Sequence, residues 1–321
     1  MKTIDSNLKR YEQIVEGLSK AMKIFPYFGY LITFFPFVAI LLNAGFLNWS
    51  SMLLVLCPFI PAMAAGFIYN TICDADKDPA NKNPVTSGII SKRISFGFCG
   101  FFLVTSAFLF VYVYSSFVAL AISFIYLFLW FAYSGIRIRI KESYLAPFVA
   151  SFVLWTGGPI ILLSEFNYFT LNTIGLIIGL FVVYVSFEIN HTIGDYDIDL
   201  KYNCKTFSVR MGKRKAIWLK HIAMTLGYIM LLVNSCNWHL SALFIISFLL
   251  LFPLSQGTMI ICDKNSVDFS RRVFSIYFFL SPFFMMKLFM VSLGIIVLGP
   301  TLEYTVLLLW LFVTDKRSFA N

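Results

Sequence analysis

The stretch from Ser51 to Asp78, SMLLVLCPFIPAMAAGFIYNTICDADKD, decides the fold of this chain. Up to Cys73 it is almost entirely apolar, and it has the length of roughly 20 residues with which an α-helix crosses a hydrocarbon core of about 30 Å. Acidic side chains follow at once, beginning with Asp74 and Asp76. Carboxylates this close together repel one another unless a cation or a hydrogen-bonding partner holds them. The stretch therefore predicts a membrane protein with a polar site where one span meets water.

The whole chain has the composition of a polytopic membrane protein. Of its 321 residues, 59% are hydrophobic and 13% are charged, and the mean hydropathy is +0.81. These values exclude an ordinary soluble domain. Nine apolar stretches that are long enough to span predict an all-α fold with nine transmembrane helices. A shorter apolar segment near 301–314 is a possible tenth, as a half-span or an interfacial helix. The nine spans are expected near 26–46, 51–73, 94–115, 117–135, 144–163, 170–191, 216–235, 239–261 and 272–296.

The basic residues indicate the orientation, because cytoplasmic loops carry an excess of Lys and Arg. These residues occur in the N-terminal tail and after spans two, four, six and eight, whereas the connections after spans one, three, five and seven hold none. The N-terminus is therefore expected in the cytoplasm, with the plasma membrane as the default location. The same distribution accounts for the net charge of +9 without a nucleic-acid partner.

The two ends of the chain carry separate expectations. Residues 1–24 lack the short apolar core of a removable signal peptide. Their apolar residues recur at helical spacing, which predicts a cytoplasmic helix that either lies along the membrane surface or caps the bundle. Residues 299–321 are expected to form the short helix and a tail. Lys287 falls inside the ninth predicted span, where either its side chain snorkels to the interface or the span ends elsewhere, and both interpretations are favoured over a catalytic role.

A second acidic cluster follows the sixth span, at Asp195, Asp197 and Asp199. Together the two clusters contain six of the ten aspartates in the chain. Four spans separate them, so both are expected on the cytoplasmic face. Carboxylates and the amide of Asn70, which lies four residues before Asp74, are hard oxygen donors of the kind that Mg²⁺ prefers when it shares its coordination with substrate phosphates.

Basic residues lie near both acidic clusters and supply positive charge for an anionic substrate. Arg137, Arg139 and Lys141 follow the fourth span, and Lys201, Lys205 and Arg210 follow the second cluster. Metal ions and cations together stabilise a departing diphosphate. The six cysteines show no paired spacing and the chain has only three histidines, so neither a zinc nor a haem centre is indicated.

The arrangement resembles the UbiA superfamily of intramembrane prenyltransferases. That family has NxxxDxxxD after its second span, Tyr-Ser followed by Arg or Lys after its fourth, and DxxxD after its sixth. The loop KNPVTSG from Lys82 to Gly88 and the segment KTFSVRMG from Lys205 to Gly212 are similar to two further family motifs. The resemblance runs from the first to the ninth span. It implies a single domain over residues 1–321, with the helices around a central cavity that opens to the cytoplasm.

The resemblance also implies roles for individual residues. One Mg²⁺ would be held by Asn70, Asp74 and Asp78, and a second by Asp195 and Asp199, so that the four aspartates are the catalytic acids. Asp76 and Asp197 rank below them. The expected substrate-binding residues are those that contact phosphate, the allylic carbon or the acceptor, namely Lys82, Tyr133, Arg137, Lys141, Asn190, Lys205 and Arg210. Glu188 and His191 are further candidates for contact with an acceptor.

Two positions depart from the family pattern, and several questions stay open. Thr71 follows Asn70 where the family often has Asp, and Asn83 stands near the usual Arg of the loop. The implied reaction is ionisation of a prenyl diphosphate and attack by a hydrophobic acceptor on the allylic cation. The acceptor can be an aromatic acid or quinone precursor, a lipid glycerol, a carotenoid or a tetrapyrrole. The prenyl length, cyclisation of the cation and a phosphoribosyl donor also stay open.

Two functions of other classes compete with this interpretation. A divalent-ion carrier or channel would use the acids to bind a transported ion, but such sites lie near the bilayer midplane on broken helices. A non-catalytic scaffold descended from the enzyme is expected to have lost the acids, and this chain retains them.

Overall fold

The computed structural model describes residues 2–22, 34–80, 83–135 and 137–234, and these residues form helices and turns with no strand. Part of the predicted first span, both of the last two spans, the segment near 301–314, Lys82 and Lys287 lie outside the described residues. The elements are α1 (Lys2–Met22), α3 (Phe35–Asn43), α4 (Trp49–Leu56), α5 (Phe59–Cys73), α6 (Lys92–Val113), α7 (Phe117–Ser134), η1 (Ile140–Glu142), α8 (Ala146–Ser151), η2 (Phe152–Thr156), α9 (Gly157–Glu165), α10 (Leu171–Gly194), α11 (Tyr196–Lys201), α12 (Phe207–Met211) and α13 (Lys213–Val233).

Six helical segments among the described residues are long and apolar enough to cross a membrane. They match the second to seventh predicted spans to within a few residues. This agreement confirms the all-helical fold and six of the nine predicted helices. The segments are Ser51–Cys73, Lys92–Val113, Phe117–Ser134, Ala146–Glu165, Leu171–Gly194 and Lys213–Val233.

Two of these spans are not continuous α-helices. In the first, α4 and α5 meet at Pro58, which has no backbone N–H to donate to the preceding turn. In the other, the chain runs from α8 through the π-helical turn η2 into α9. Such turns are rare and occur often at functional sites. Here Val153 and Leu154 of η2 face the cavity described below.

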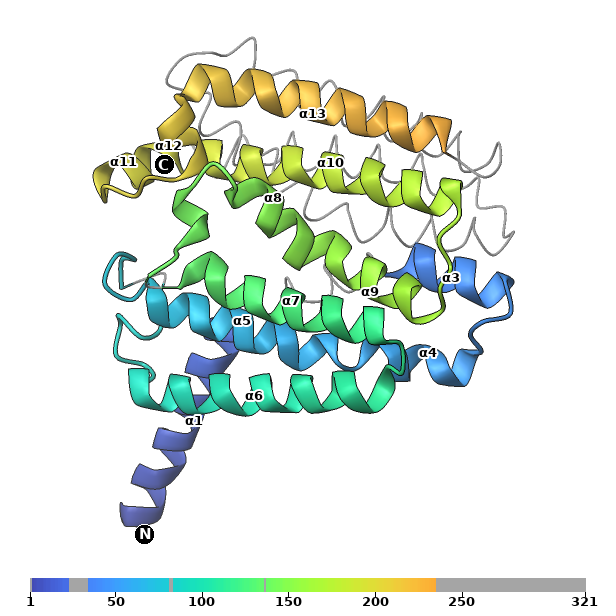
Figure 1. Ribbon diagram of the computed structural model, residues 1–321. Coiled ribbons are helices and arrows are strands. Elements are labelled where there is room, and N and C mark those ends of the chain that lie inside the picture. Colours follow the sequence, from blue (N-terminus) through green and yellow to red (C-terminus); the bar gives the residue numbers. More distant parts are fainter. Residues whose placement is uncertain (1, 23–33, 81–82, 136, 235–321) are drawn as a thin grey trace, which may run out of the picture.

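The spans form a bundle in which α5 packs against α6 and α7, and α10 packs against α13 (Figure 1). Glycines allow the second pair to approach closely. A Cβ atom at Gly227 would lie 2.8 Å from the backbone nitrogen of Val183, and one at Gly179 would lie 3.1 Å from that of Leu231. Small residues at the contact let membrane helices pack backbone to backbone. This close contact fixes the position of α10 against α13, and α10 leads into the second acidic cluster.

The connections that follow α5, α7 and α10 gather at one end of the bundle, on the left in Figure 1. The short helices α11 and α12 lie at the same end. The two acidic clusters are therefore on one side, as the span count predicts. Which side of the membrane this is stays an expectation from the basic residues.

The N-terminal segment forms the predicted helix. Figure 1 shows α1 projecting away from the bundle near the end that carries the acidic clusters. Its last turns pack onto α5, where Leu18 and Ala21 are buried with Ile68 and Ile72. This contact anchors one end of α1 to the bundle.

Candidate active site

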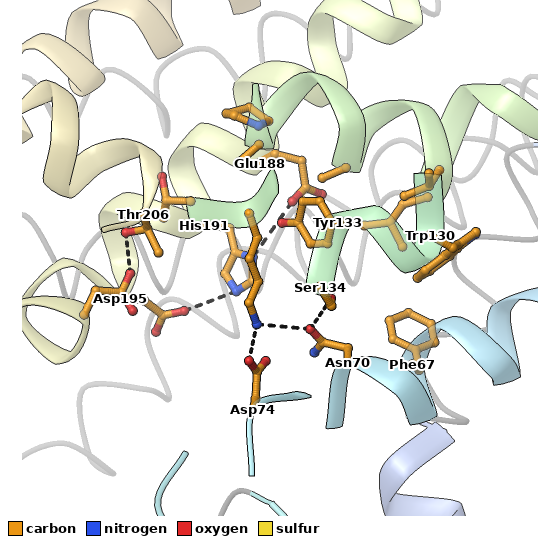
Figure 2. Close-up of a pocket in the computed structure, with 18 residues that line it drawn as sticks. Phe67, Asn70, Asp74, Trp130, Tyr133, Ser134, Glu188, His191, Asp195 and Thr206 are labelled. Atoms are coloured by element: carbon orange, nitrogen blue, oxygen red, sulfur yellow. Dashed lines mark hydrogen bonds and ion pairs between the residues drawn. The ribbon is translucent and has the colours of Figure 1, made fainter. Parts of the chain in front are cut away.

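A cavity of about 440 Å³ lies between α5, α7, α8, η2 and α10, at the end of the bundle that carries both acidic clusters. One part of its wall is polar and the other is apolar (Figure 2). The polar lining residues are Asn70, Asp74, Tyr133, Ser134, Lys141, Glu188, His191, Thr192, Asp195, Asp199 and Thr206. The apolar ones are Phe67, Trp130, Ala146, Pro147, Ala150, Val153 and Leu154.

The first motif enters the cavity where α5 ends. Asn70 lies on the last turn of α5, and Asp74 is the residue that terminates the helix. The hydroxyl of Ser134, at the end of α7, donates to Oδ1 of Asn70 at 2.6 Å. This bond fixes the orientation of the Asn70 side chain, which lines the cavity. Ser134 was part of the Tyr-Ser motif, but its contact with Asn70 was not predicted.

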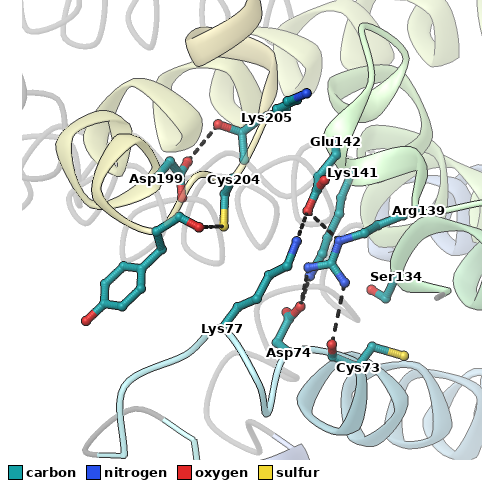
Figure 3. Close-up of polar contacts among 12 residues, drawn as sticks. Cys73, Asp74, Lys77, Ser134, Arg139, Lys141, Glu142, Asp199, Cys204 and Lys205 are labelled. Atoms are coloured by element: carbon teal, nitrogen blue, oxygen red, sulfur yellow. Dashed lines mark hydrogen bonds and ion pairs between the residues drawn. The ribbon is translucent and has the colours of Figure 1, made fainter.

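Two cations from the connection after α7 bind the carboxylate of Asp74, which is 7% exposed. Lys141 donates to Oδ1 of Asp74 and to Oδ1 of Asn70, the latter at 3.3 Å. Arg139 donates to the same Asp74 oxygen from Nη2 at 3.1 Å (Figure 3). The segment after the fourth span therefore contacts the first motif directly. From the sequence, the two segments were expected only on the same face of the membrane.

Glu142 completes this network and ties the two connections together. It accepts from Nζ of Lys77 at 2.7 Å and from Nε of Arg139 at 2.5 Å. Burial alone would raise the pKa of Glu142, but the hydrogen bonds from Lys77 and Arg139 outweigh it and hold that pKa below its usual value. Neither Lys77 nor Glu142 belongs to a predicted motif, so no sequence signal pointed to this link.

The second motif reaches the cavity at the end of α10. Asp195 terminates that helix, and Asp199 follows on α11. Thr206 donates to Oδ2 of Asp199 at 2.7 Å, and Nε2 of His191 lies 3.3 Å from Oδ2 of Asp195. Burial raises the pKa of Asp199 to about 6, with a further contribution from the charge of Asp195 and an opposing one from the Thr206 bond.

Further into the cavity, Glu188 and Tyr133 lie near each other (Figure 2). Glu188 is 6% exposed, and its Oε1 accepts a hydrogen bond from Nε1 of Trp155 at 3.1 Å. Its Oε2 lies 4.0 Å from Nδ1 of His191. The sequence offered Glu188 and His191 as candidates for acceptor contact, and both line the cavity.

Five of the predicted site residues that the structure describes lie outside the cavity lining, and Asp78 and Asn190 are two of them. Asp78 follows the end of α5, and its Oδ2 accepts from Nδ2 of Asn83 at 3.2 Å. The same amide donates to the carbonyl of Thr71 at 2.8 Å, so Asn83 folds this loop back onto α5. Asn190 is fully buried and accepts from Lys220 on α13 at 3.3 Å. Asp78 remains a candidate through its motif, and Asn190 remains one through its place in the sequence near the second motif.

The other predicted phosphate contacts are at the rim or beyond it. Arg137 and Lys205 are exposed and do not line the cavity. Arg210 donates from Nε to the carbonyls of Glu142 and Lys205, at 2.5 and 2.9 Å. Asp76 is exposed, as is Asp197, and neither lines the cavity. The roles assigned to these residues stay predictions.

The donor atoms at the cavity suit a hard divalent cation. Among the described residues, no group of three or more His, Cys, Asp or Glu side chains surrounds one metal position. The first motif nevertheless offers two oxygens to one positive charge, because the Lys141 ammonium bonds to both Asn70 and Asp74. Asp195 and Asp199 supply further carboxylates across the same cavity. Amide and carboxylate oxygens of this kind fit Mg²⁺.

Comparison with protein families decides the relationship. A family model described as the UbiA prenyltransferase family matches residues 30–282. This chain belongs to that family. Membership in the UbiA family supports an intramembrane prenyltransferase, and with the six apolar spans it shows an integral membrane protein. No curated protein sequence matches the chain.

Solved structures share the UbiA fold with this chain. A UbiA homologue from Archaeoglobus fulgidus bound to DMAPP and Mg²⁺ has a TM-score of 0.67 at 15% identity, covering 87% of this chain and 100% of that one. A digeranylgeranylglyceryl phosphate synthase has a TM-score of 0.61 at 18% identity, covering 90% and 99%. An apo UbiA homologue from Aeropyrum pernix K1 has a TM-score of 0.61 at 17% identity, covering 83% and 98%.

Proposed function

We propose that this protein transfers a prenyl group from a prenyl diphosphate to a hydrophobic acceptor in a Mg²⁺-dependent reaction. One observation carries the proposal: Asn70 and Asp74 of the first motif line the same cavity as Asp195 and Asp199 of the second, and Lys141 lines it too. Mg²⁺ held by these acids, together with Lys141, would match the negative charge of the diphosphate, and the apolar wall suits its isoprenoid chain. The homologue from Archaeoglobus fulgidus bound to GPP and Mg²⁺ supports this class of donor.

The two motifs would each hold one metal ion. Asn70 and Asp74 are the first pair of ligands and Asp195 and Asp199 the second, while Asp78 is a further ligand of the first by its motif. Mg²⁺ bound there would neutralise diphosphate oxygens and stabilise pyrophosphate as the leaving group.

The cations beside the first motif have a second task in this proposal. Lys141 and Arg139 both bind Asp74 in the structure. A metal ion on Asp74 competes with them for its oxygen, and a diphosphate in the cavity offers them new acceptor oxygens. We propose that Lys141 transfers its hydrogen bonds from the aspartate to the phosphate, where it stabilises the developing charge.

The rest of the cavity protects the reactive cation. The bond between the allylic carbon and the diphosphate oxygen breaks, and its electron pair leaves with pyrophosphate. The acceptor then forms its new bond to that carbon and loses a proton. Aromatic faces at Trp130 and Tyr133 can stabilise positive charge, and the apolar wall excludes water from it.

An ion carrier is a weaker candidate on the same geometry. The acids lie together at one end of the bundle. The first of them is bound by Arg139 and Lys141, which would oppose a metal ion that arrives without an anion.

The test is pyrophosphate release by purified protein in lipid nanodiscs, supplied with prenyl diphosphates of several lengths and a lipid extract as a source of acceptor. Release is expected to require Mg²⁺ and to fall by at least about a hundredfold in Asp74→Ala and Asp195→Ala, since each removes a metal ligand. Asp76→Ala and Asp197→Ala are matched controls, because they remove neighbouring exposed acids. Folded native protein that binds Mg²⁺ but releases no pyrophosphate from any donor would refute the proposal.

A further inference from the structure

A buried acid inside a membrane span is the feature that the prenyl-transfer chemistry leaves unused. Glu188 belongs to α10, well within the span Leu171–Gly194, and its side chain lines the cavity. A charged group at this depth is costly and usually marks a binding or transport function. Neither metal pair includes Glu188, so its position needs a separate explanation.

Glu188 lies deeper along α10 than the second acidic motif. Glu188 precedes Asp195 by seven residues, which is two helical turns or about 10 Å along α10. His191 lies between them on the same face, and all three line the cavity (Figure 2). With the diphosphate at the level of Asp195, an acceptor that approaches the allylic carbon from the inner part of the cavity lies toward Glu188.

The carboxylate is held rigidly. Trp155 donates to Oε1 of Glu188 at 3.1 Å, and the indole stacks on the ring of Tyr184 with centroids 4.2 Å apart and an interplanar angle of 5°. Both rings are buried. A carboxylate accepts several hydrogen bonds at once, so contact with Trp155 is compatible with a bond from a ligand O–H. A rigid acceptor group of this kind orients a ligand at little entropic cost.

Charge at the cavity wall restricts what such a ligand can be. Among the described lining residues are four carboxylates, at Asp74, Glu188, Asp195 and Asp199, and one ammonium, that of Lys141. Metal ions would offset the acids of the two motifs but are not expected two turns deeper. An anionic group beside Glu188 would therefore meet like charge in a poorly solvated place.

We propose that Glu188 is the acceptor-recognition residue: it receives a hydrogen bond from a neutral hydroxyl of the acceptor and disfavours acceptors that place a carboxylate there. The acceptor class is then a phenol or an alcohol without an acid group at that position. The inference rests on the proposed function, because that function makes the bound ligand an acceptor. The binding preference itself can be measured without any reaction.

The competing explanation is that Glu188 only anchors Trp155. Glu188→Gln separates the two, because the amide oxygen still accepts from the indole while the negative charge is lost. A structural role predicts normal behaviour of this variant. Recognition of a hydroxyl predicts a changed choice between ligands in a protein that remains folded.

Three probes of nearly equal size make the comparison: 4-propylphenol, its methyl ether 4-propylanisole, and 4-propylbenzoate. Binding is measured by equilibrium dialysis against protein in nanodiscs, with empty nanodiscs subtracted. It is measured with and without Mg²⁺ and an unreactive geranyl thiodiphosphate. Glu165→Gln is the matched control, because Glu165 is the other glutamate in a described span and contacts Ser115 and Ser116 away from the cavity lining.

Native protein is expected to bind the phenol about tenfold more tightly than the ether, since the ether cannot donate to the carboxylate. It should bind the benzoate more weakly still. In Glu188→Gln the benzoate should gain about tenfold relative to the phenol, and in Glu188→Leu the preference for phenol over ether should disappear. Glu165→Gln should keep the native order.

Equal binding of phenol and ether by native protein would overturn the inference, as would a ratio of phenol to benzoate affinity that is unchanged in Glu188→Gln. Pyrophosphate release is measured on the same preparations. Native protein that prefers the phenol through Glu188 but releases no pyrophosphate would refute the proposed function while supporting the hydroxyl site, so the two failures are distinguishable.

Discussion

Replacement of Lys141 by methionine should change the affinity for two ligands in opposite directions. In the structure the Lys141 ammonium bonds to Asp74 and Asn70, the oxygens that we assign to the first metal ion. Free metal must therefore displace an internal cation. A metal–diphosphate complex instead gains Lys141 as a phosphate contact. Methionine keeps most of the unbranched side chain and removes the charged end with its hydrogen bonds.

The magnitude follows from the burial of the pair. The side chains of Lys141 and Asp74 are 16% and 10% exposed, so solvent screens their attraction little. A hydrogen bond between charged groups contributes about 1.5–3 kcal/mol net. Arg139 retains its own 3.1 Å bond to Asp74 in the variant, which favours the lower end. We expect divalent-ion affinity without donor to rise by about tenfold, because 1.4 kcal/mol corresponds to a factor of ten.

Mn²⁺ binding followed by electron paramagnetic resonance measures this directly, first alone and then with geranyl thiodiphosphate. In Lys141→Met, Mn²⁺ alone should bind about tenfold more tightly, and the analogue in the presence of Mn²⁺ should bind at least about tenfold more weakly, since one charged phosphate contact is lost. Lys92→Met is the control, because Lys92 is exposed at the start of α6. A variant in which both affinities fall, or neither changes, would refute the exchange of Lys141 between aspartate and phosphate.

Three further predictions concern packing and protonation at the cavity. Gly66→Ala would place a Cβ atom 2.2 Å from the Trp130 ring, so we expect a loss of about 1–3 kcal/mol of stability and slower turnover. Gly97→Ala in α6, with no atom within 4 Å of the added Cβ, is the control and should lower neither the unfolding temperature nor the rate. Because the pKa of Asp199 is raised to about 6, its carboxylate takes up a proton as the pH falls from 7 to 5. The Mg²⁺ concentration for half-maximal pyrophosphate release should therefore rise over that interval. A Mg²⁺ concentration that stays constant over it would count against Asp199 as a ligand. Thr206→Val removes a bond that favours the charged form of Asp199, so the same rise should begin at higher pH, and an unchanged profile would show that the bond has no such effect.

The hydropathy pattern predicted most of the described bundle, and the physical reason is specific to membranes. A span must satisfy its backbone hydrogen bonds internally, so an apolar run of sufficient length becomes a helix almost regardless of its tertiary contacts. The range 51–73 therefore appears as predicted. The π-helical turn at Phe152–Thr156 was not predicted, because it depends on how one span packs against its neighbours.

The part of the candidate site that lies at helix ends was predictable from the sequence. Asn70 and Asp74 lie at the end of α5 and Asp195 lies at the end of α10, so helical spacing and the span count together bring them to one place. Asp78 lies beyond the helix, where the buried amide of Asn83 determines the path of the chain. Loop paths of this kind depend on single long-range hydrogen bonds, which sequence patterns do not encode.

The partners of the first acid were missed for a related reason. Arg139 has a left-handed backbone conformation, with φ of +40°, in the connection after α7. This turn brings Arg139 and Lys141 to Asp74, although the positive-inside rule accounts for both residues by orientation alone. Both residues were expected near the site as cations, but their bonds to Asp74 were not predicted.

The central claim is that both acidic motifs bind one metal–diphosphate complex in the cavity at the end of α5 and α10. An experimental structure with Mn²⁺ and geranyl thiodiphosphate, with the metal located by its anomalous scattering, tests this most directly. We expect metal ions at Asn70 and Asp74 and at Asp195 and Asp199, a diphosphate that bridges them, and the Lys141 ammonium on a phosphate oxygen. Metal on only one motif, or a diphosphate bound outside this cavity, would contradict the claim.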